Sequence, residues 1–308
     1  MDLETRTIDN IISPYCVCIY DGIKVKTFYL TNYKNSDEML LDSVKSIMQR
    51  KYNNYKVYLH NFSYFDGIFL LRVLTMLSDK IKPTIKDNNL ININFKFGEK
   101  YSLYFRDSLL LLPGSLKSLA KAFNVEEKGI FPYKFVNIKH LPLDYIGEIP
   151  NIKYFESLTY KEYYDYCLQY STDNNWSLKA ETIKYCIQDC KVLYQIIEKF
   201  SKNIFLISNV NVTEYPTLSS LAFAIFRTKF MNKENIPVLT GEIYNFISKG
   251  YTGGAVDVYK PYGENIYRYD VNSLYPYIMH TNKLPIVTPN YFEGDITKSI
   301  AGFLEDKT

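Results

Sequence analysis

Three short stretches of the sequence carry four acidic side chains at spacings that could bind metal ions. Asp2 and Glu4 are two residues apart, so in a strand both carboxylates leave the same face. Asp66 begins an apolar helical run, and Asp189 lies one helical turn after Tyr185. Carboxylates in this pattern suit two divalent cations about 4 Å apart, the arrangement used for in-line attack on a phosphodiester. In that chemistry the tyrosine hydroxyl would orient the attacking water.

Each of these positions also has an ordinary structural explanation. An acidic pair on a strand is often a solvated edge, and Asp66 could be a helix N-cap. Tyr185 and Asp189, taken alone, would be a boundary tyrosine beside a solvated acid. The N-cap explanation does not account for Asn61 and Phe65, because an amide and an aromatic ring just before an acid resemble a site that stacks a base and positions a sugar-phosphate. Considered together, the four acids favour the metal-dependent chemistry.

Composition limits the class of protein without deciding its partner. The chain has 308 residues, 47% of them hydrophobic, which predicts about two domains. A net charge of +3 is too small to establish nucleic-acid binding. The five cysteines form no C-x-x-C pattern and, with three histidines, no structural zinc spacing, so we interpret them as reduced thiols in an intracellular compartment. No apolar run approaches the roughly 20 residues of a membrane helix, so no membrane contact is expected.

Strands and helices must alternate to position the acids. Short alternating or apolar runs predict strands over residues 15–20, 25–30, 55–61, 91–97 and 101–112, with another at the first acidic pair. Helical spacing predicts helices over residues 66–77, 115–123, 176–200 and 218–230. This mixture predicts an α/β or α+β domain that the long helix at 176–200 closes.

A different pattern begins near residue 240. Glycines around residue 250 and a strand-like run over 255–271 predict a new β-rich unit. Asp270 lies near the end of that run, just before a Ser-Leu-Tyr-Pro turn, where an acid could hold a metal. A helix is expected to start near Ser273 and Leu274, whose amides could receive phosphate groups.

The ordered set of motifs resembles a known family. "DLET", "NFSYFD" and "YCIQD" resemble the three exonuclease motifs of family B DNA polymerases, and "YTGG" at 251–254 and "DVNSLYP" at 270–276 resemble its linker motif and first polymerase motif. "SLKSL" and "KGIF" resemble motifs of the protein-primed subgroup, which includes mitochondrial and linear-plasmid polymerases. The resemblance implies an α/β fold: an RNase H-like 3′–5′ exonuclease domain, with a mixed sheet flanked by helices, over residues 1–205. Linker helices and the beginning of a polymerase palm domain would follow over residues 206–308.

The resemblance also implies roles for individual residues. The two Mg²⁺ or Mn²⁺ ions of a proofreading exonuclease would be held by Asp2, Glu4, Asp66 and Asp189, with Tyr185 placing the water. Lys128 would assist that site by its charge. A single-stranded 3′ end would be held by Thr5, Asn61, Phe65, Ser115 and Leu116, although packing and turn formation are alternative explanations for Ser115 and Leu116.

Further roles follow for the remaining motifs. The linker loop that helps to partition the primer–template between the two activities would contain Tyr251, Gly253 and Gly254, for which a simple β-turn is the alternative. Asp270 would be the first catalytic, metal-binding aspartate of the palm, and the deoxynucleotide would contact Ser273, Leu274 and Tyr275. The implied partners are primer–template DNA, deoxynucleotides in the full-length enzyme and a terminal protein primer. The Asn-, Lys- and Tyr-rich composition and the subgroup favour an organellar or linear-plasmid gene and a mitochondrial location.

Two departures from the family pattern affect these expectations. Asp2 directly follows Met1, so we expect the strand that carries Asp2 to be short and its carboxylate loosely held. The family's lysine-bearing helix and its second palm aspartates are absent, so we expect that this chain alone does not polymerise DNA. We expect it to be either the N-terminal part of a longer enzyme or a decayed reading frame. Two alternatives remain: a non-catalytic remnant that binds single-stranded DNA, and a stand-alone RNase H-like exonuclease that does not need residues 240–308.

Overall fold

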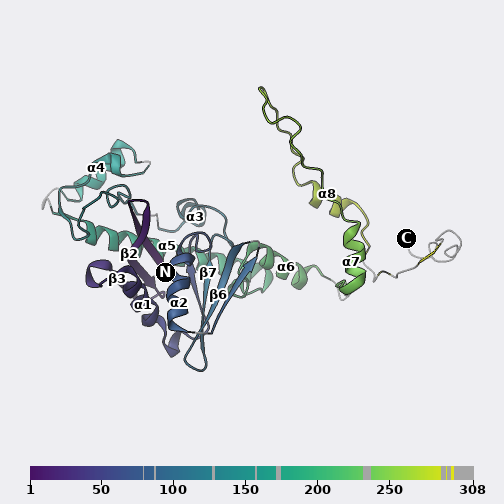
Figure 1. The fold of residues 1–308 in the computed structure, drawn as a ribbon, viewed down its shortest axis with the longest axis horizontal. Coiled ribbons are helices and arrows are strands. Elements are labelled where there is room, and N and C mark those ends of the chain that lie inside the picture. The colour runs from purple at the N-terminus through teal and green to yellow at the C-terminus, as the bar shows by residue number, and fades with distance from the viewer. Residues whose placement is uncertain are drawn as a thin grey trace. The chain divides into compact units, whose positions relative to one another are not determined.

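The computed structural model describes residues 1–78, 80–86, 88–126, 129–156, 158–170, 175–231, 237–285, 289 and 293–294. The chain divides into two compact units, residues 1–230 and 231–308 (Figure 1). The first unit therefore extends beyond the domain boundary predicted at residue 205. Within the described ranges, none of the helices combines the length and apolarity that crossing a bilayer requires.

Two sheets form the centre of the first unit (Figure 1). The first sheet is antiparallel in the order β1-β2-β3, with strands β1 (Asp2–Ile8), β2 (Ile11–Tyr20) and β3 (Val25–Tyr29). The second sheet has the order β4-β7-β6-β5, and its strands are β4 (Tyr55–Leu59), β5 (Ile81–Lys86), β6 (Asn89–Phe97) and β7 (Tyr101–Asp107). β4 pairs with β7 in parallel, and the other two pairings are antiparallel. The second sheet is therefore mixed, as the family resemblance implies.

Helices cover these sheets. The helices of the first unit are α1 (Ser36–Ile47), α2 (Asp66–Leu77), α3 (Leu116–Phe123), α4 (Tyr160–Leu168), α5 (Leu178–Ser208) and α6 (Leu218–Lys229). Short 3₁₀ turns lie between them at η1 (Leu30–Asn32), η2 (Arg50–Tyr52), η3 (Ile152–Tyr154) and η4 (Val212–Glu214), and a small ladder joins β8 (Ile146–Gly147) to β9 (Trp176–Ser177). The long helix α5 contacts β1, β2 and β3.

The alternation of side chains in the first sheet separates two apolar clusters. Leu3 and Val17 belong to a core that includes residues of α1 and α2, such as Met39. Cys18, on the other face of β2, packs in a second core with Cys186 of α5. Because successive residues of a strand point to opposite faces, Asp2 and Glu4 share the face that α5 covers.

Most elements predicted from the sequence are confirmed in the first unit. The predicted runs overlap with β1, β2, β3, β4, β6 and β7 and with α2, α3, α5 and α6, although β2 begins earlier, β7 ends earlier and α5 continues further than predicted. The helices α1 and α4 and the strand β5 were not predicted. α6 belongs to the first unit because Leu221 and Ala224 pack in one buried cluster with Phe200 of α5, which explains why the unit continues past residue 205.

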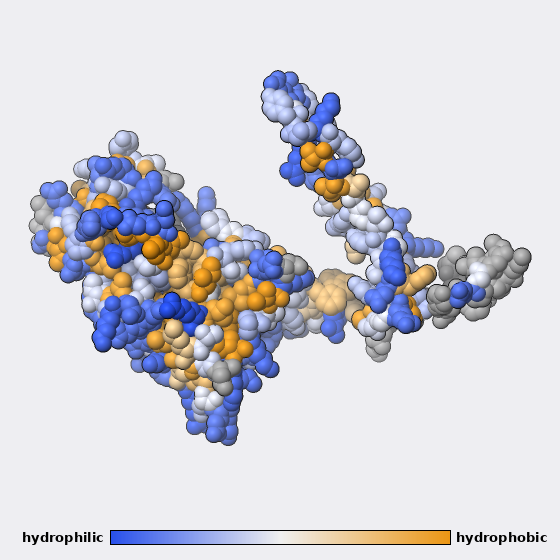
Figure 2. All heavy atoms as spheres, in the orientation of Figure 1, coloured by the Kyte–Doolittle hydropathy of each residue, from blue (hydrophilic) through white to orange (hydrophobic). Residues whose placement is uncertain are grey.

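The predicted β-rich character of the second unit is wrong for the part that the structure describes. Residues 237–285 contain the helices α7 (Gly241–Lys249) and α8 (Leu274–Thr281) and no strand. The run at 255–271 leaves Val256 and Tyr269 almost fully exposed, and Figure 2 shows hydrophobic residues at the surface of this unit. A strand needs partners that bury one of its faces. The alternating pattern therefore forms no sheet here.

Candidate functional site

The first acidic pair lies on a strand that is anchored at its start. The amine of Met1 donates a 3.1 Å hydrogen bond to the carbonyl oxygen of Tyr58 in β4, and the Met1 side chain is buried. A ligand atom from each of Asp2, Glu4 and Cys186 lies within 4.8 Å of the other two. We expected the short strand to hold the Asp2 carboxylate loosely. The anchored Met1 argues against that expectation.

Asp66 is the first residue of α2 and is buried. Phe65 occupies the N-cap position and no side chain caps the helix, so the N-cap explanation of Asp66 is wrong. Burial, and then the charges of Asp2 and Asp107, raise the pKa of Asp66 to about 8. The contribution from Asp2 indicates that Asp66 lies within electrostatic range of the first acidic pair.

Asp107, which the sequence analysis missed, orders the loop that leads to Asp66. Its carboxylate is fully buried at the end of β7 and accepts hydrogen bonds from the backbone N–H groups of Asn61, Ser63 and Leu109 at 3.0, 2.8 and 2.8 Å. Asn61 adopts a left-handed backbone conformation with a φ of +72°. An acid at the end of an apolar strand was the available signal for this role.

Tyr185 and Asp189 of α5 are both buried. This contradicts the explanation of the pair as a boundary tyrosine beside a solvated acid. The Tyr185 hydroxyl donates a 2.7 Å hydrogen bond to Oδ2 of Asp189, and it also contacts the hydroxyl of Tyr133. Burial, and then the charge of Asp189, raise the pKa of Tyr185, with a smaller contribution from Glu4. This contribution links the α5 pair electrostatically to the acids of β1.

Three cysteine thiols also converge beside the acids. The sulfur atoms of Cys16, Cys18 and Cys186 lie within 4.8 Å of one another, and all three residues are buried. Cys186 donates a 3.6 Å hydrogen bond to the backbone carbonyl of Asp2. The sequence contains no zinc-like spacing because this group forms between a strand and a distant helix.

The residues predicted to contact a DNA end have different environments. Thr5 follows a bulge in β1 and is half-buried. The half-buried ring of Phe65 packs edge-on against Phe69 at 5.7 Å. Ser115 is exposed and caps α3 by accepting from the N–H group of Ser118, and Leu116 is buried in an apolar cluster with α5. Capping and packing thus account for Ser115 and Leu116, and Lys128 lies outside the described residues.

The remaining predicted residues belong to the second unit. Tyr251 is exposed, and a Cβ atom at Gly253 or Gly254 would meet open space. Asp270 is also exposed and belongs to no helix or strand. The predicted helix start is confirmed, because Ser273 is the N-cap of α8, Leu274 is its first residue, and Tyr275 follows with an exposed ring.

Comparisons with known proteins agree on one family. The model of DNA polymerase type B, organellar and viral, matches residues 46–307. A probable DNA polymerase of Neurospora intermedia is 40% identical over 96% of this chain and 33% of its own length, and one of Ascobolus immersus is 38% identical over 99% and 26%. The chain thus spans about a third or less of the length of these curated relatives.

Solved structures show the same fold. Phi29 DNA polymerase, complexed with primer-template DNA and incoming nucleotide substrates, matches 82% of this chain and 38% of its own with a TM-score of 0.50 at 17% identity. Among sequence relatives, a DNA polymerase of human adenovirus A serotype 12 is 28% identical over 59% of the chain and 19% of its own length. With the family match over most of the sequence, the chain belongs to the organellar and viral type B DNA polymerases.

Proposed function

We propose that residues 1–230 form an RNase H-like, two-metal 3′–5′ exonuclease in the N-terminal part of a protein-primed type B DNA polymerase. One observation supports the proposal: acids far apart in the sequence lie within electrostatic range of one another in the first unit. Asp2 lies beside Glu4 and raises the pKa of Asp66, while Glu4 acts on Tyr185, the hydrogen-bond partner of Asp189. Asp2 is half-buried and Glu4, Asp66 and Asp189 are buried, so ionisation of all four carboxylates is costly unless cations accompany them, and the raised pKa of Asp66 reflects this cost.

The donor set fits the metal ions that this family implies. Carboxylate oxygens are the ligands that Mg²⁺ and Mn²⁺ prefer, and Asp2, Glu4, Asp66 and Asp189 would supply them. When bound, the two ions would activate water and stabilise the leaving oxygen of a phosphodiester. The thiol of Cys186 lies beside the acids but is a soft donor, so we leave it out of the ligand set.

The chain's own residues then orient the reactants. The Tyr185 hydroxyl is positioned by Asp189 and Tyr133 and can hold a water molecule by its remaining hydrogen-bonding capacity. Asp107 and the loop from residue 60 to 65 hold the start of α2, which carries Asp66. Thr5, Asn61 and the ring of Phe65 would contact the single-stranded 3′ end, with Lys128 adding positive charge.

The second unit would contribute to DNA synthesis in the whole protein. Asp270 would bind a metal, and the start of α8, with Ser273, Leu274 and Tyr275, would bind the incoming deoxynucleotide. The loop containing Tyr251, Gly253 and Gly254 would guide the primer–template. We further propose a terminal protein as the primer and a mitochondrial location, which rest on the protein-primed subgroup and on composition.

A nuclease assay with substituted chains tests the proposal. The full chain should shorten a 5′-labelled single strand from its 3′ end in the presence of Mg²⁺, and Asp66→Ala or Asp189→Ala should abolish this activity. Asp165→Ala, at an exposed position of α4, is the matched control and should leave it unchanged. If both site variants still cut DNA, the assignment is wrong. Salt-sensitive DNA binding without cleavage by the unsubstituted chain would favour the non-catalytic alternative.

A further inference from the structure

Four of the five cysteines gather between the first sheet and α5. Cys16 and Cys18 are two residues apart on β2, so both thiols leave the face that α5 covers. Cys186 and Cys190 are one turn apart on α5 and share the face that packs on this strand. The sulfur atoms of Cys16, Cys18 and Cys186 lie within 4.8 Å of one another, and the Cys190 thiol interacts with that of Cys186. A strand and a helix thus each direct two thiols towards the other.

The spacing of these sulfur atoms is close to that of a metal–thiolate centre. A Zn–S bond is about 2.3 Å long, so two sulfur atoms of a tetrahedral zinc site lie roughly 3.8 Å apart. From separations within 4.8 Å, each of the three sulfur atoms needs to move by about 1 Å or less, which a small rotation about the Cα–Cβ bond supplies. Soft thiolate donors select Zn²⁺ and Cu⁺, whereas Mg²⁺ prefers oxygen.

The surroundings of the thiols are those of a closed site. Cys16, Cys18 and Cys186 are fully buried, and the rings of Tyr15 and Trp176 pack in the same apolar cluster. A structural metal site is closed by four protein donors, whereas a catalytic one keeps a position open for water. Burial of the thiols therefore indicates a structural cation, separate from the oxygen-bound ions proposed for the acids.

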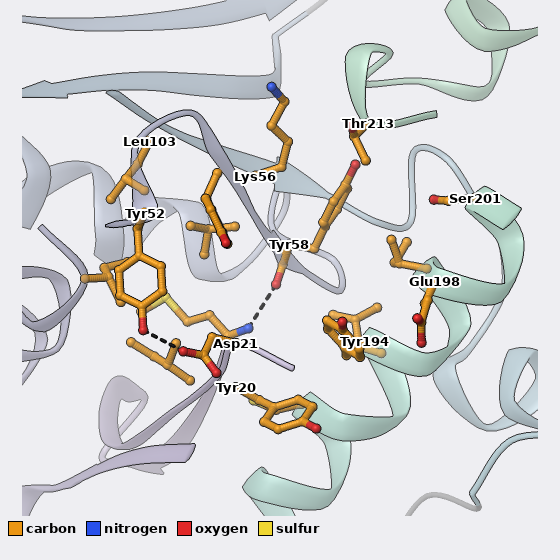
Figure 3. Close-up of a pocket in the computed structure, with 18 of the residues that line it drawn as sticks. Tyr20, Asp21, Tyr52, Lys56, Tyr58, Leu103, Tyr194, Glu198, Ser201 and Thr213 are labelled. Atoms are coloured by element: carbon orange, nitrogen blue, oxygen red, sulfur yellow. Dashed lines mark hydrogen bonds between the residues drawn. The ribbon is translucent and has the colours of Figure 1, made fainter. Parts of the chain in front are cut away.

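A cation can reach the thiols through Cys190. This residue lines a cavity of about 610 Å³ together with Tyr194 and Glu198 of the same helix (Figure 3). A cation that enters the cavity meets the Cys190 thiol first and then the thiol of Cys186, with which Cys190 interacts. The closed group of thiols therefore has an entry path.

We propose that Cys16, Cys18 and Cys186 bind one soft cation of the Zn²⁺ class, with Cys190 as the fourth donor. Each thiol that becomes a ligand releases its proton to solvent, so binding itself forms the thiolates. Cys186 and Cys190 give up the hydrogen bonds that they donate to backbone carbonyls at 3.6 and 3.3 Å, which costs little because S–H groups are weak donors. The bound cation ties β2 to α5 beside Asp2, whose carbonyl accepts from Cys186.

Metal binding by the full chain tests this site without relying on nuclease activity. Reducing conditions keep the thiols free, excess Mg²⁺ occupies the carboxylates, and Cd²⁺ serves as the spectroscopic probe. Cd²⁺ should produce a thiolate-to-metal charge-transfer band that saturates at one equivalent per chain, and excess Zn²⁺ should displace it. Zn²⁺ at about a hundred times its dissociation constant should raise the melting temperature by roughly 5 °C or more.

Single cysteine substitutions locate the bound cation. Cys18→Ala and Cys186→Ala should each lower the affinity for Cd²⁺ at least about tenfold, because each removes one ligand. Cys167→Ala is the matched control, because Cys167 lies on α4 outside the group of four thiols. It should keep both the charge-transfer band and the rise in melting temperature.

Several results would overturn the thiolate site. The first is the absence of a charge-transfer band from the unsubstituted chain at several equivalents of Cd²⁺, which does not depend on any variant folding. The second is a band that survives in both Cys18→Ala and Cys186→Ala, or one that disappears in Cys167→Ala, because the cation then binds elsewhere. The third is Zn²⁺ binding that Asp66→Ala removes and the cysteine variants keep, which assigns the cation to the carboxylates. A failure of nuclease activity leaves all of these readouts intact.

Discussion

Removal of the Asp107 carboxylate is expected to weaken both the fold and the proposed site. This buried group accepts three backbone N–H hydrogen bonds, from Asn61, Ser63 and Leu109. Each hydrogen bond to a charged acceptor contributes about 1.5 to 3 kcal/mol. Because the three share one carboxylate, their contributions do not simply add. We therefore expect Asp107→Ala to lower the free energy of unfolding by about 3 to 5 kcal/mol, the range seen when one partner of a buried charged group is removed.

The same substitution should disturb the position of Asp66. Asn61 is held in a left-handed conformation, and two of the three hydrogen bonds hold the segment just before α2. A displacement of a catalytic group by about 1 Å can lower a rate about a hundredfold. Nuclease activity per folded molecule should therefore fall by about that factor in Asp107→Ala, even at temperatures where the variant stays folded.

Thermal unfolding followed by circular dichroism measures the first effect, and single-turnover hydrolysis of a labelled strand measures the second. A loss of about 3 kcal/mol predicts a melting temperature lower by roughly 6 °C or more in a unit of this size. Asp165→Ala removes an exposed acid and should change neither quantity. The argument fails if Asp107→Ala melts within about one degree of the unsubstituted chain, because the three hydrogen bonds would then contribute little.

Three other perturbations test separate parts of the structure. Tyr185→Phe removes the hydroxyl that bonds Asp189 and should slow hydrolysis at least about tenfold, with an unchanged far-ultraviolet spectrum; an unchanged rate would exclude the water-orienting role. Although burial opposes it, hydrogen bonds from two backbone N–H groups and the Tyr52 hydroxyl lower the pKa of Asp21 to about 2. Asp21 therefore contributes stability above pH about 4 that is lost as the pH falls towards 2, so urea titrations should show Asp21→Asn less stable by about 1 kcal/mol at pH 7 and equal at pH 2. Chelation with EDTA should stop hydrolysis and leave salt-sensitive strand binding, and hydrolysis that persists in EDTA would refute a metal-dependent site.

Local sequence patterns predicted the elements of the first unit well. The apolar spacing of residues 66–77 depends on neighbours within one or two helical turns, and α2 has these bounds. The period of two along residues 2–8 likewise predicted that Asp2 and Glu4 share a face of β1. These predictions succeeded because the side chains concerned are positioned by their own element.

Contacts between distant segments could not be predicted from local sequence patterns. Asp107 bonds residues more than forty positions earlier, and its sequence context is that of an ordinary strand end. The thiols of Cys16, Cys18 and Cys186 meet only because α5 crosses the face of β2. Spacing rules for metal-binding cysteines describe ligands within one turn or loop, so they gave no sign of this group.

In the second unit the prediction failed for a different reason: the local pattern of a strand was present, but none of the described residues pairs with it. Residues 255–271 alternate as a strand does, but an edge forms a sheet only if another strand accepts its hydrogen bonds and covers one face.

The buried pair on α5 combines both lessons. The spacing of Tyr185 and Asp189 correctly predicted that they share a helix face, and their 2.7 Å hydrogen bond follows from it. Their burial was not predictable from α5 itself, because Tyr133 and Phe131 arrive from a segment without helix or strand and cover the tyrosine. Burial strengthens the electrostatic interactions of Asp189 because water no longer screens its charge. The helix thus sets which residues act together, and the segment around residue 131 sets how strongly their charges are felt.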